Sequence, residues 1–145
     1  MPTPSIDSTA LASRGIRVAE VLGCMGAIAA IKLSLAWRGF AATLARIEAR
    51  SDAAGSPPPA DDAIVARLDH LLAAAAALYP GRALCLERSL VLYDRLRRAG
   101  VRADLRLGVQ AAPFAAHAWI ERHGAPVNDV LEHIEQFTPI ALGRR

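Results

Sequence analysis

The sequence predicts an α+β fold in which apolar helices come first and a small antiparallel sheet comes last. Alanine and leucine dominate a chain of 145 residues that is 53% hydrophobic and only 5% aromatic, a composition that favours helix. The apolar spacing is helical up to about residue 100, and from Val101 it changes to an alternation with period two. A chain of this length is enough for one domain with its own core.

The N-terminal third of the chain is predicted to be helical. The pattern runs from about Arg14 to Ala49, and a break is expected near Gly39. One apolar stripe in this region follows helical spacing, and we interpret it as core packing: it comprises Trp37, Phe40, Leu44 and Ile47.

An apolar run within this region, residues 21–37, has the composition of a membrane-associated helix. A span needs roughly 20 apolar residues, and here Lys32 and Ser34 interrupt the window. We therefore expect a helix that faces the core or a partner, with contact at a membrane surface and a true span as the alternatives. No secretory signal is expected, because the run begins well after the N-terminus and no clear cleavage site follows it.

Residues 51–60, SDAAGSPPPA, are predicted to be a linker, because three consecutive prolines exclude helix. This linker divides the chain into a helical, apolar N-terminal extension (1–60) and a core domain (61–145). A second helix is expected to begin at Asp61 or Asp62 and to end near Leu78, before Tyr-Pro-Gly.

A third helix is predicted from residues 83–85 to Gly100, where glycine is a natural helix stop. Cys85, Ser89 and Leu92 share one stripe of this helix, so the thiol lies in its first turn, on the inward face. The unpaired backbone N–H groups of a first turn and the helix dipole stabilise an anion there, which favours the thiolate.

The C-terminal part is predicted to be an antiparallel meander. The alternating segment from Val101 is followed by a connection at 110–113, a second strand at 115–122, a turn at 123–126 and a third short strand at 126–130.

The charge pattern argues against a nucleic-acid-binding protein. Arginine supplies 16 of the 17 basic residues, and most of them are spread singly, with no basic stripe and no interleaved aromatics. The two cysteines are too few for a disulfide framework, and their surroundings differ, since Cys24 lies in an apolar run and Cys85 beside charges. This asymmetry favours a reduced, cytoplasmic protein with one structural thiol and one candidate reactive thiol.

A thiol, an imidazole and a carboxylate follow one another within 45 residues, as Cys85, His117 and Asp129. A cysteine nucleophile needs a base that holds it as thiolate and a third group that orients the base. A tight turn after the His117 strand would bring Asn128 or Asp129 beside the imidazole. We prefer Asp129, because a carboxylate also stabilises the imidazolium, and Asn128 is the alternative.

Five segments carry a resemblance to a known family: CLERSL (85–90), the alternating strand that follows AGV (99–101), HAWIE (117–121), GAPVND (124–129) and FTPI (137–140). Over roughly residues 62–142 the chain resembles the lasso-peptide biosynthesis B2 proteins of the transglutaminase-like cysteine protease superfamily. The resemblance implies a papain- or transglutaminase-like fold with Cys85 as nucleophile, His117 as general base and Asp129 as orienting group. It implies removal of the leader peptide from a precursor peptide, so that a separate lasso cyclase can close the ring.

The resemblance also implies partners. Fused members of the family carry a strand-bearing leader-recognition domain at the N-terminus, whereas residues 1–60 show no strand pattern. A separate leader-recognition protein is therefore expected, and any nucleotide dependence would come from a partner.

No metal and no cofactor are expected, because the histidines and cysteines show neither CxxC nor HxxxH spacing. His70, His123 and His133 are assigned to the surface.

Two other functions stay open. One is acyl transfer to an amine by a transglutaminase-like enzyme that acts on another substrate. The other is a non-catalytic helical interaction module in which Cys85 is merely a small buried side chain.

Overall fold

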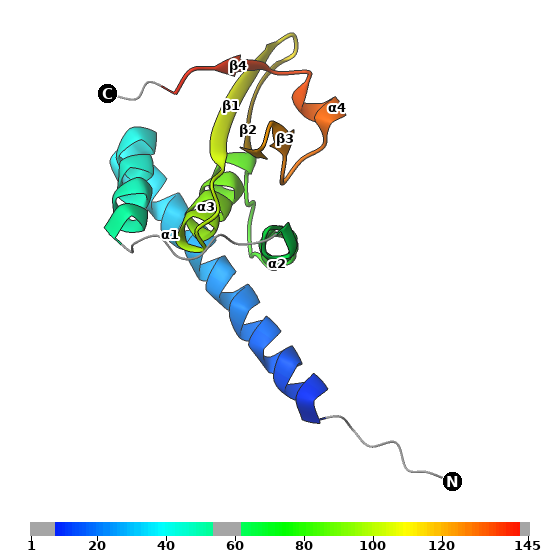
Figure 1. Ribbon diagram of the computed structural model, residues 1–145. Coiled ribbons are helices and arrows are strands. Elements are labelled where there is room, and N and C mark those ends of the chain that lie inside the picture. The colour runs from blue at the N-terminus through cyan, green and yellow to red at the C-terminus, as the bar shows by residue number, and fades with distance from the viewer. Residues whose placement is uncertain (1–7, 54–61, 143–145) are drawn as a thin grey trace.

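The computed structural model describes residues 8–53 and 62–142, with side chains for 18–52 and 62–142. Helices precede the sheet, as predicted (Figure 1). The elements are α1 (Ser8–Ala53), α2 (Asp62–Leu78), α3 (Cys85–Arg98), β1 (Asp104–Ala111), β2 (Phe114–Arg122), β3 (Ala125–Pro126), α4 (Leu131–Ile134) and β4 (Thr138–Ile140). This is the α+β arrangement that the change of period near residue 100 indicates.

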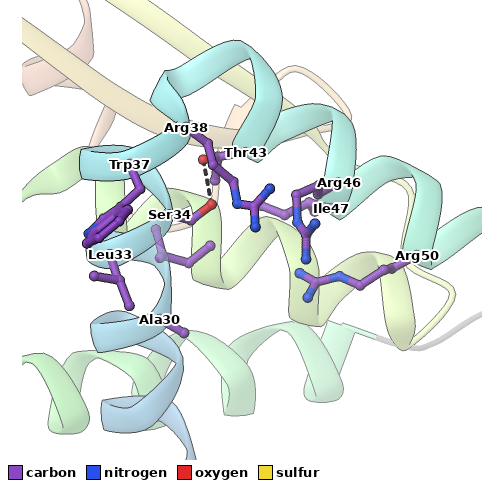
Figure 2. A pocket seen from close by; sticks show the side chains of 10 residues that line it. Ala30, Leu33, Ser34, Trp37, Arg38, Thr43, Arg46, Ile47 and Arg50 are labelled. Atoms are coloured by element: carbon purple, nitrogen blue, oxygen red, sulfur yellow. Dashed lines mark hydrogen bonds between the residues drawn. The ribbon is translucent and has the colours of Figure 1, made fainter.

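Helix α1 bends at Gly39, the position where a break was expected. Gly39 has φ 77° and ψ 177°, a conformation that glycine adopts without the steric cost of a Cβ. On either side of the bend, Ser34 Oγ and Thr43 Oγ1 lie 2.8 Å apart (Figure 2), and Thr43 also donates to the carbonyl of Gly39. The N-terminal part of α1 extends away from the rest of the molecule (Figure 1).

The predicted core stripe of α1 is wrong at Trp37. Ile47 is fully buried and Phe40 and Leu44 are partly buried, but the Trp37 side chain is 82% exposed. The bend at Gly39 explains the difference, because residues before and after it no longer share one helical face.

Helix α1 is long and apolar enough, from Val18 to Asp52, to cross a membrane by length and composition alone, a property that core helices and signal sequences share. Its apolar run is nevertheless in contact with the domain, because Ile28 and Ile31 are buried in the core. Lys32, the charge that interrupts the run, pairs with Glu87 of α3 at 3.3 Å.

The predicted linker overlaps the end of α1. Ser51 is buried and donates to the carbonyl of Ile47 at 2.9 Å, so the helix continues into the SDA segment. The proline-rich part of the prediction, and Asp61, lie outside the described residues. Helix α2 runs from Asp62 to Leu78 as expected, with Val65 and Leu72 buried.

The four strands form one antiparallel sheet in the order β3-β2-β1-β4. The predicted connection at 110–113 is shorter than expected, because pairing extends to Ala111 and leaves only Ala112-Pro113, a cis peptide, as the turn. Helix α4 and strand β4 were not predicted.

The predicted third strand at 126–130 is wrong beyond Pro126. Val127 N–H still donates to Ile120 O at 2.8 Å, but Ile120 N–H donates to the side chain of Asn128, also at 2.8 Å. The amide side chain takes the place of a backbone acceptor there, so the ladder ends after Ala125–Pro126.

Strand β2 separates two apolar clusters, and its alternation decides which side chain enters which. Ile120 belongs to the main core with Leu105 and the helices, whereas Trp119 belongs to a small cluster with Ile134 and Phe137. His117 lies on the Trp119 side, as predicted, and its ring contacts both Trp119 and Phe137.

Candidate active site

Cys85 is the first residue of α3 and is half-buried. The turn before it is extended at Leu84, whose backbone N–H donates to Glu87 Oε2 at 2.6 Å. Glu87 is itself buried and pairs with Lys32, so the start of the helix is fixed by a side chain of its own first turn.

One turn further along α3, Ser89 ties this helix to strand β2. Ser89 is fully buried, and its hydroxyl donates to the carbonyl of Ala118 at 2.9 Å. Asn128 completes the link: its amide nitrogen donates to Ser89 Oγ at 3.1 Å, and its oxygen accepts from Ile120 N–H. Helix and strand are therefore joined between the residues that carry the thiol and the imidazole.

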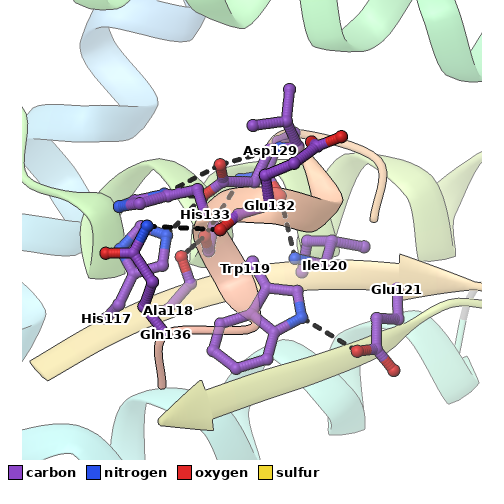
Figure 3. Close-up of polar contacts among 12 residues, drawn as sticks. His117, Ala118, Trp119, Ile120, Glu121, Asp129, Glu132, His133 and Gln136 are labelled. Atoms are coloured by element: carbon purple, nitrogen blue, oxygen red, sulfur yellow. Dashed lines mark hydrogen bonds and ion pairs between the residues drawn. The ribbon is translucent and has the colours of Figure 1, made fainter. Parts of the chain in front are cut away.

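His117 and Asp129 are in contact (Figure 3). His117 Nε2 is hydrogen bonded to Asp129 Oδ2, and both side chains are 14% exposed. Asp129 Oδ1 accepts from the N–H of Val130 at 2.8 Å, which fixes the carboxylate. The two orienting groups left open by the sequence thus lie in different places, Asp129 against the ring and Asn128 between Ser89 and Ile120.

The carboxyl of Asp129 is held in its charged form. Partial burial acts to raise its pKa, but the hydrogen bonds from His117, the backbone N–H of Val130 and His133 outweigh burial and lower the pKa below the ordinary value.

His133 is a part of this cluster that the sequence analysis missed. Its Nδ1 lies 2.9 and 3.0 Å from the two oxygens of Asp129, and its ring centroid is 4.7 Å from that of His117. The expectation that His133 belongs to the surface is therefore wrong in part: its side chain is 44% exposed but bonded to the carboxylate. The i, i+4 spacing of Asp129 and His133 is the sequence signal for this contact, because residues four apart lie on one side of a helical turn.

Aromatic side chains form the wall beneath the His117 ring. The ring stacks on Trp119 with centroids 5.9 Å apart, and Phe137 lies 5.1 Å away. Trp119 Nε1 donates to Glu121, which also pairs with Arg106 at 2.9 Å, so the indole is held at its polar edge.

Gly108 allows this wall to form. It faces His117 across the β1–β2 ladder, and a Cβ placed there would lie 2.8 Å from the Phe137 Cβ and 3.0 Å from the Trp119 ring. No side chain fits in that space without a shift of an aromatic ring.

A model of the Transglutaminase-like superfamily matches residues 27–142, most of the chain, from within α1 to the end of the sheet. The chain belongs to the transglutaminase-like superfamily. No curated protein matches it, and no solved structure does. The superfamily includes cysteine peptidases and acyltransferases, so membership supports thiol chemistry without fixing the reaction.

Within this transglutaminase-like protein the two thiols differ, as predicted. Cys24 is buried in the core, and burial raises the pKa of its thiol. Cys85 is partly accessible, and among the described residues it has no hydrogen bond to His117 or Asp129. Catalytic hydrogen bonds in substrate-free enzymes are often long and tighten when substrate binds.

The same transglutaminase-like site brings together three groups that could hold a metal ion. Each of these residues offers one ligand atom, and the three atoms lie within 4.8 Å of one another; the residues are His117, Asp129 and His133. Imidazole nitrogens and a carboxylate oxygen are ligands that zinc accepts. The spacing rules applied to the sequence did not predict this group.

Proposed function

We propose that this protein is a cysteine peptidase that removes the leader peptide from a lasso-peptide precursor. Cys85 is the nucleophile, His117 the general base and Asp129 the group that orients and stabilises the imidazole. The observation that carries the proposal is the contact of Asp129 with His117 Nε2, because it leaves Nδ1 as the ring nitrogen that can serve the thiol.

The remaining contacts of the site support the same roles for Cys85, His117 and Asp129. Asn128 is engaged by Ser89 and by the backbone of Ile120, so it is not available to the ring. The lowered pKa keeps Asp129 charged when the imidazole takes up a proton. Cys85 lies in the first turn of α3, and the free N–H groups at a helix start stabilise a thiolate and an oxyanion.

The reaction follows from these groups. The thiolate of Cys85 attacks the scissile carbonyl carbon, and the imidazolium of His117 gives its proton to the leaving amine as the C–N bond breaks. The thioester is then attacked by water, and His117 takes up one proton of that water. The leader leaves with a new carboxylate, and the thiolate–imidazolium pair is restored.

The partners and location belong to the same proposal. The described part of α1 is helical on both sides of the bend at Gly39, which fits a peptidase that depends on a separate leader-recognition protein. The free amine produced by cleavage is the group that a lasso cyclase needs. These reactions are proposed to take place in the cytoplasm, where Cys85 stays reduced.

The second candidate function is acyl transfer to an amine, because the superfamily includes acyltransferases. Product mass separates the two reactions, since hydrolysis adds one water to the fragments and transamidation does not.

The test is mass spectrometry of a lasso precursor encoded beside this protein, incubated with it and the leader-recognition partner. Wild type, Cys85→Ala and Cys24→Ala are compared, the last as a matched control for removal of a thiol. The proposal expects hydrolysed leader with wild type and Cys24→Ala, and none with Cys85→Ala. Cleavage that persists in Cys85→Ala refutes it, and a mass without added water shifts the function to acyl transfer.

A further inference from the structure

A stripe of exposed apolar side chains runs along the outer face of α1. Val18, Leu22 and Leu33 are each 60% exposed and Trp37 is 82% exposed. At about 100° per residue these positions, together with the exposed Gly26, fall on one side of the helix. We call Val18, Leu22, Leu33 and Trp37 the outer stripe of α1.

The outer stripe is long enough to receive a partner element. From Val18 to Trp37 it extends roughly 28 Å, since each helical residue adds about 1.5 Å. Nothing lies within 4 Å of the place a Cβ would occupy at Gly26, so another chain can approach the helix closely there. Exposed apolar surface of this extent is typical of an interaction site.

The stripe ends at a pocket of about 450 Å³ between the two arms of α1, lined by Leu33 and Trp37 and by three arginines (Figure 2). We call Arg38, Arg46 and Arg50 with Trp37 the arginine pocket. In Figure 2 the three guanidinium groups are gathered on one side of the bend, and the indole ring lies on the other.

The positive charge of the arginine pocket is only partly neutralised. Arg50 lies 3.6 Å from Asp94. Arg38 and Arg46 have no ion-pair or hydrogen-bond partner among the residues that the structure describes, and both are exposed. Guanidinium groups bind carboxylates through paired hydrogen bonds, and Trp and Arg are the side chains that contribute most to protein interfaces.

We propose that the outer stripe and the arginine pocket form one docking site for a peptide segment of a partner protein. The segment carries apolar side chains along one face and carboxylates next to them, which meet Arg38 and Arg46. The concave shape favours a peptide over a lipid surface, because a flat bilayer does not fill a pocket between two helix arms whereas a side chain does. The site lies on α1 and is independent of the catalytic assignment.

Trp37 supplies a direct readout, because the second tryptophan, Trp119, is only 2% exposed. The probes are a short synthetic amphipathic peptide with leucines on one face and glutamates in its last turn, and two analogues with glutamine or lysine in place of glutamate. The full chain is titrated with each. The glutamate peptide is expected to shift Trp37 emission to the blue and to bind about tenfold or more tightly than the glutamine peptide.

A charge swap tests the arginines themselves. Arg38→Glu with Arg46→Glu should lose about tenfold or more in affinity for the glutamate peptide and gain affinity for the lysine peptide, whereas the exposed control Arg102→Glu should change neither. Protection of the buried Cys24 from alkylation in each variant reports an intact fold. Equal binding of the glutamate and glutamine peptides, or no binding of either, overturns the proposal. If Trp37 emission shifts with anionic phospholipid vesicles but with none of the peptides, the proposal is overturned in favour of a membrane surface.

Discussion

The hydroxyl of Ser89 donates a hydrogen bond of 2.9 Å to the carbonyl oxygen of Ala118, the residue that directly follows His117. Ser89 lies one turn after Cys85 on α3, so this bond joins the helix of the thiol to the strand of the imidazole. Asn128 contacts the same hydroxyl and the neighbouring backbone, and so brings the loop that carries Asp129 to the same point. The buried Ser89 therefore helps to fix the positions of Cys85, His117 and Asp129 relative to one another.

Ser89→Ala is expected to reduce both stability and activity. The substitution leaves the carbonyl of Ala118 and the amide of Asn128 without their partner, which costs about 1–3 kcal/mol of unfolding free energy. Urea unfolding and precursor cleavage measure the two effects. Ser34→Ala, which removes a hydroxyl bonded to Thr43 at the bend of α1, is the matched control and should leave cleavage unchanged. If Ser89→Ala is as stable as wild type, the hydrogen bonds of Ser89 do not hold α3 to β2.

Substitution of Asp129 is expected to lower activity, and substitution of Asn128 is expected to lower stability. Asp129→Ala should lower kcat by about 10²–10⁴, by analogy with the loss of the orienting carboxylate in other triads, with little change in KM. Asn128→Ala should chiefly lower stability, because its contacts are to Ser89 and Ile120. The reverse outcome, an active Asp129→Ala and an inactive but stable Asn128→Ala, would assign the orienting role to the amide.

The lowered pKa of Asp129 predicts a pH-dependent contribution to folding. A carboxyl whose pKa is lower in the native state stabilises the fold fully above the unfolded value, about 3.9, and loses this contribution as pH falls through the native value. The difference in unfolding free energy between wild type and Asp129→Asn should therefore narrow as pH falls from about 5 to about 2. Urea titrations of both proteins measure it, and a difference that does not change with pH contradicts the interpretation.

Gly108→Ala is expected to disturb the aromatic wall under His117. The new methyl group would meet Phe137 and Trp119 at 3.0 Å or less, and overpacking of this kind costs about 1–3 kcal/mol. Gly26→Ala is the matched control, since nothing lies within 4 Å of its Cβ position and alanine favours helix. Thermal unfolding and near-ultraviolet dichroism of Trp119 follow the effect. If the two variants are equally stable, Phe137 and Trp119 make room for the methyl group without loss of unfolding free energy, which contradicts the prediction.

Local pattern was sufficient for helices α1 to α3 and for strand β2. The bend at Gly39, the ends of α2 and the separation of Trp119 from Ile120 follow from glycine, capping and period-two rules, which act over a few residues. The pairing of His117 with Asp129 could be predicted for the same reason, because the chain reverses at the tight turn after β2 and brings the two residues side by side. Their catalytic roles stay a prediction.

The errors arose where tertiary contacts override the local pattern. Trp37 fits a core stripe by spacing, but the bend at Gly39 turns it outward. The segment after Pro126 follows a tight turn and was therefore expected to pair as a third strand, but the side chain of Asn128 occupies the ladder position. The contact of His133 with Asp129 left only their i, i+4 spacing as a signal, because α4 is too short to produce a helical period.

The most direct test of the account is the reaction of native protein with iodoacetamide near neutral pH, followed by peptide mapping. Cys24, buried in the core, is the internal control and should stay unmodified. We expect Cys85 to be alkylated rapidly, and the rate to fall in His117→Ala and, less strongly, in Asp129→Asn, because both hold the thiolate. A Cys85 that is inert, or one that reacts equally fast without His117, would contradict the catalytic assignment.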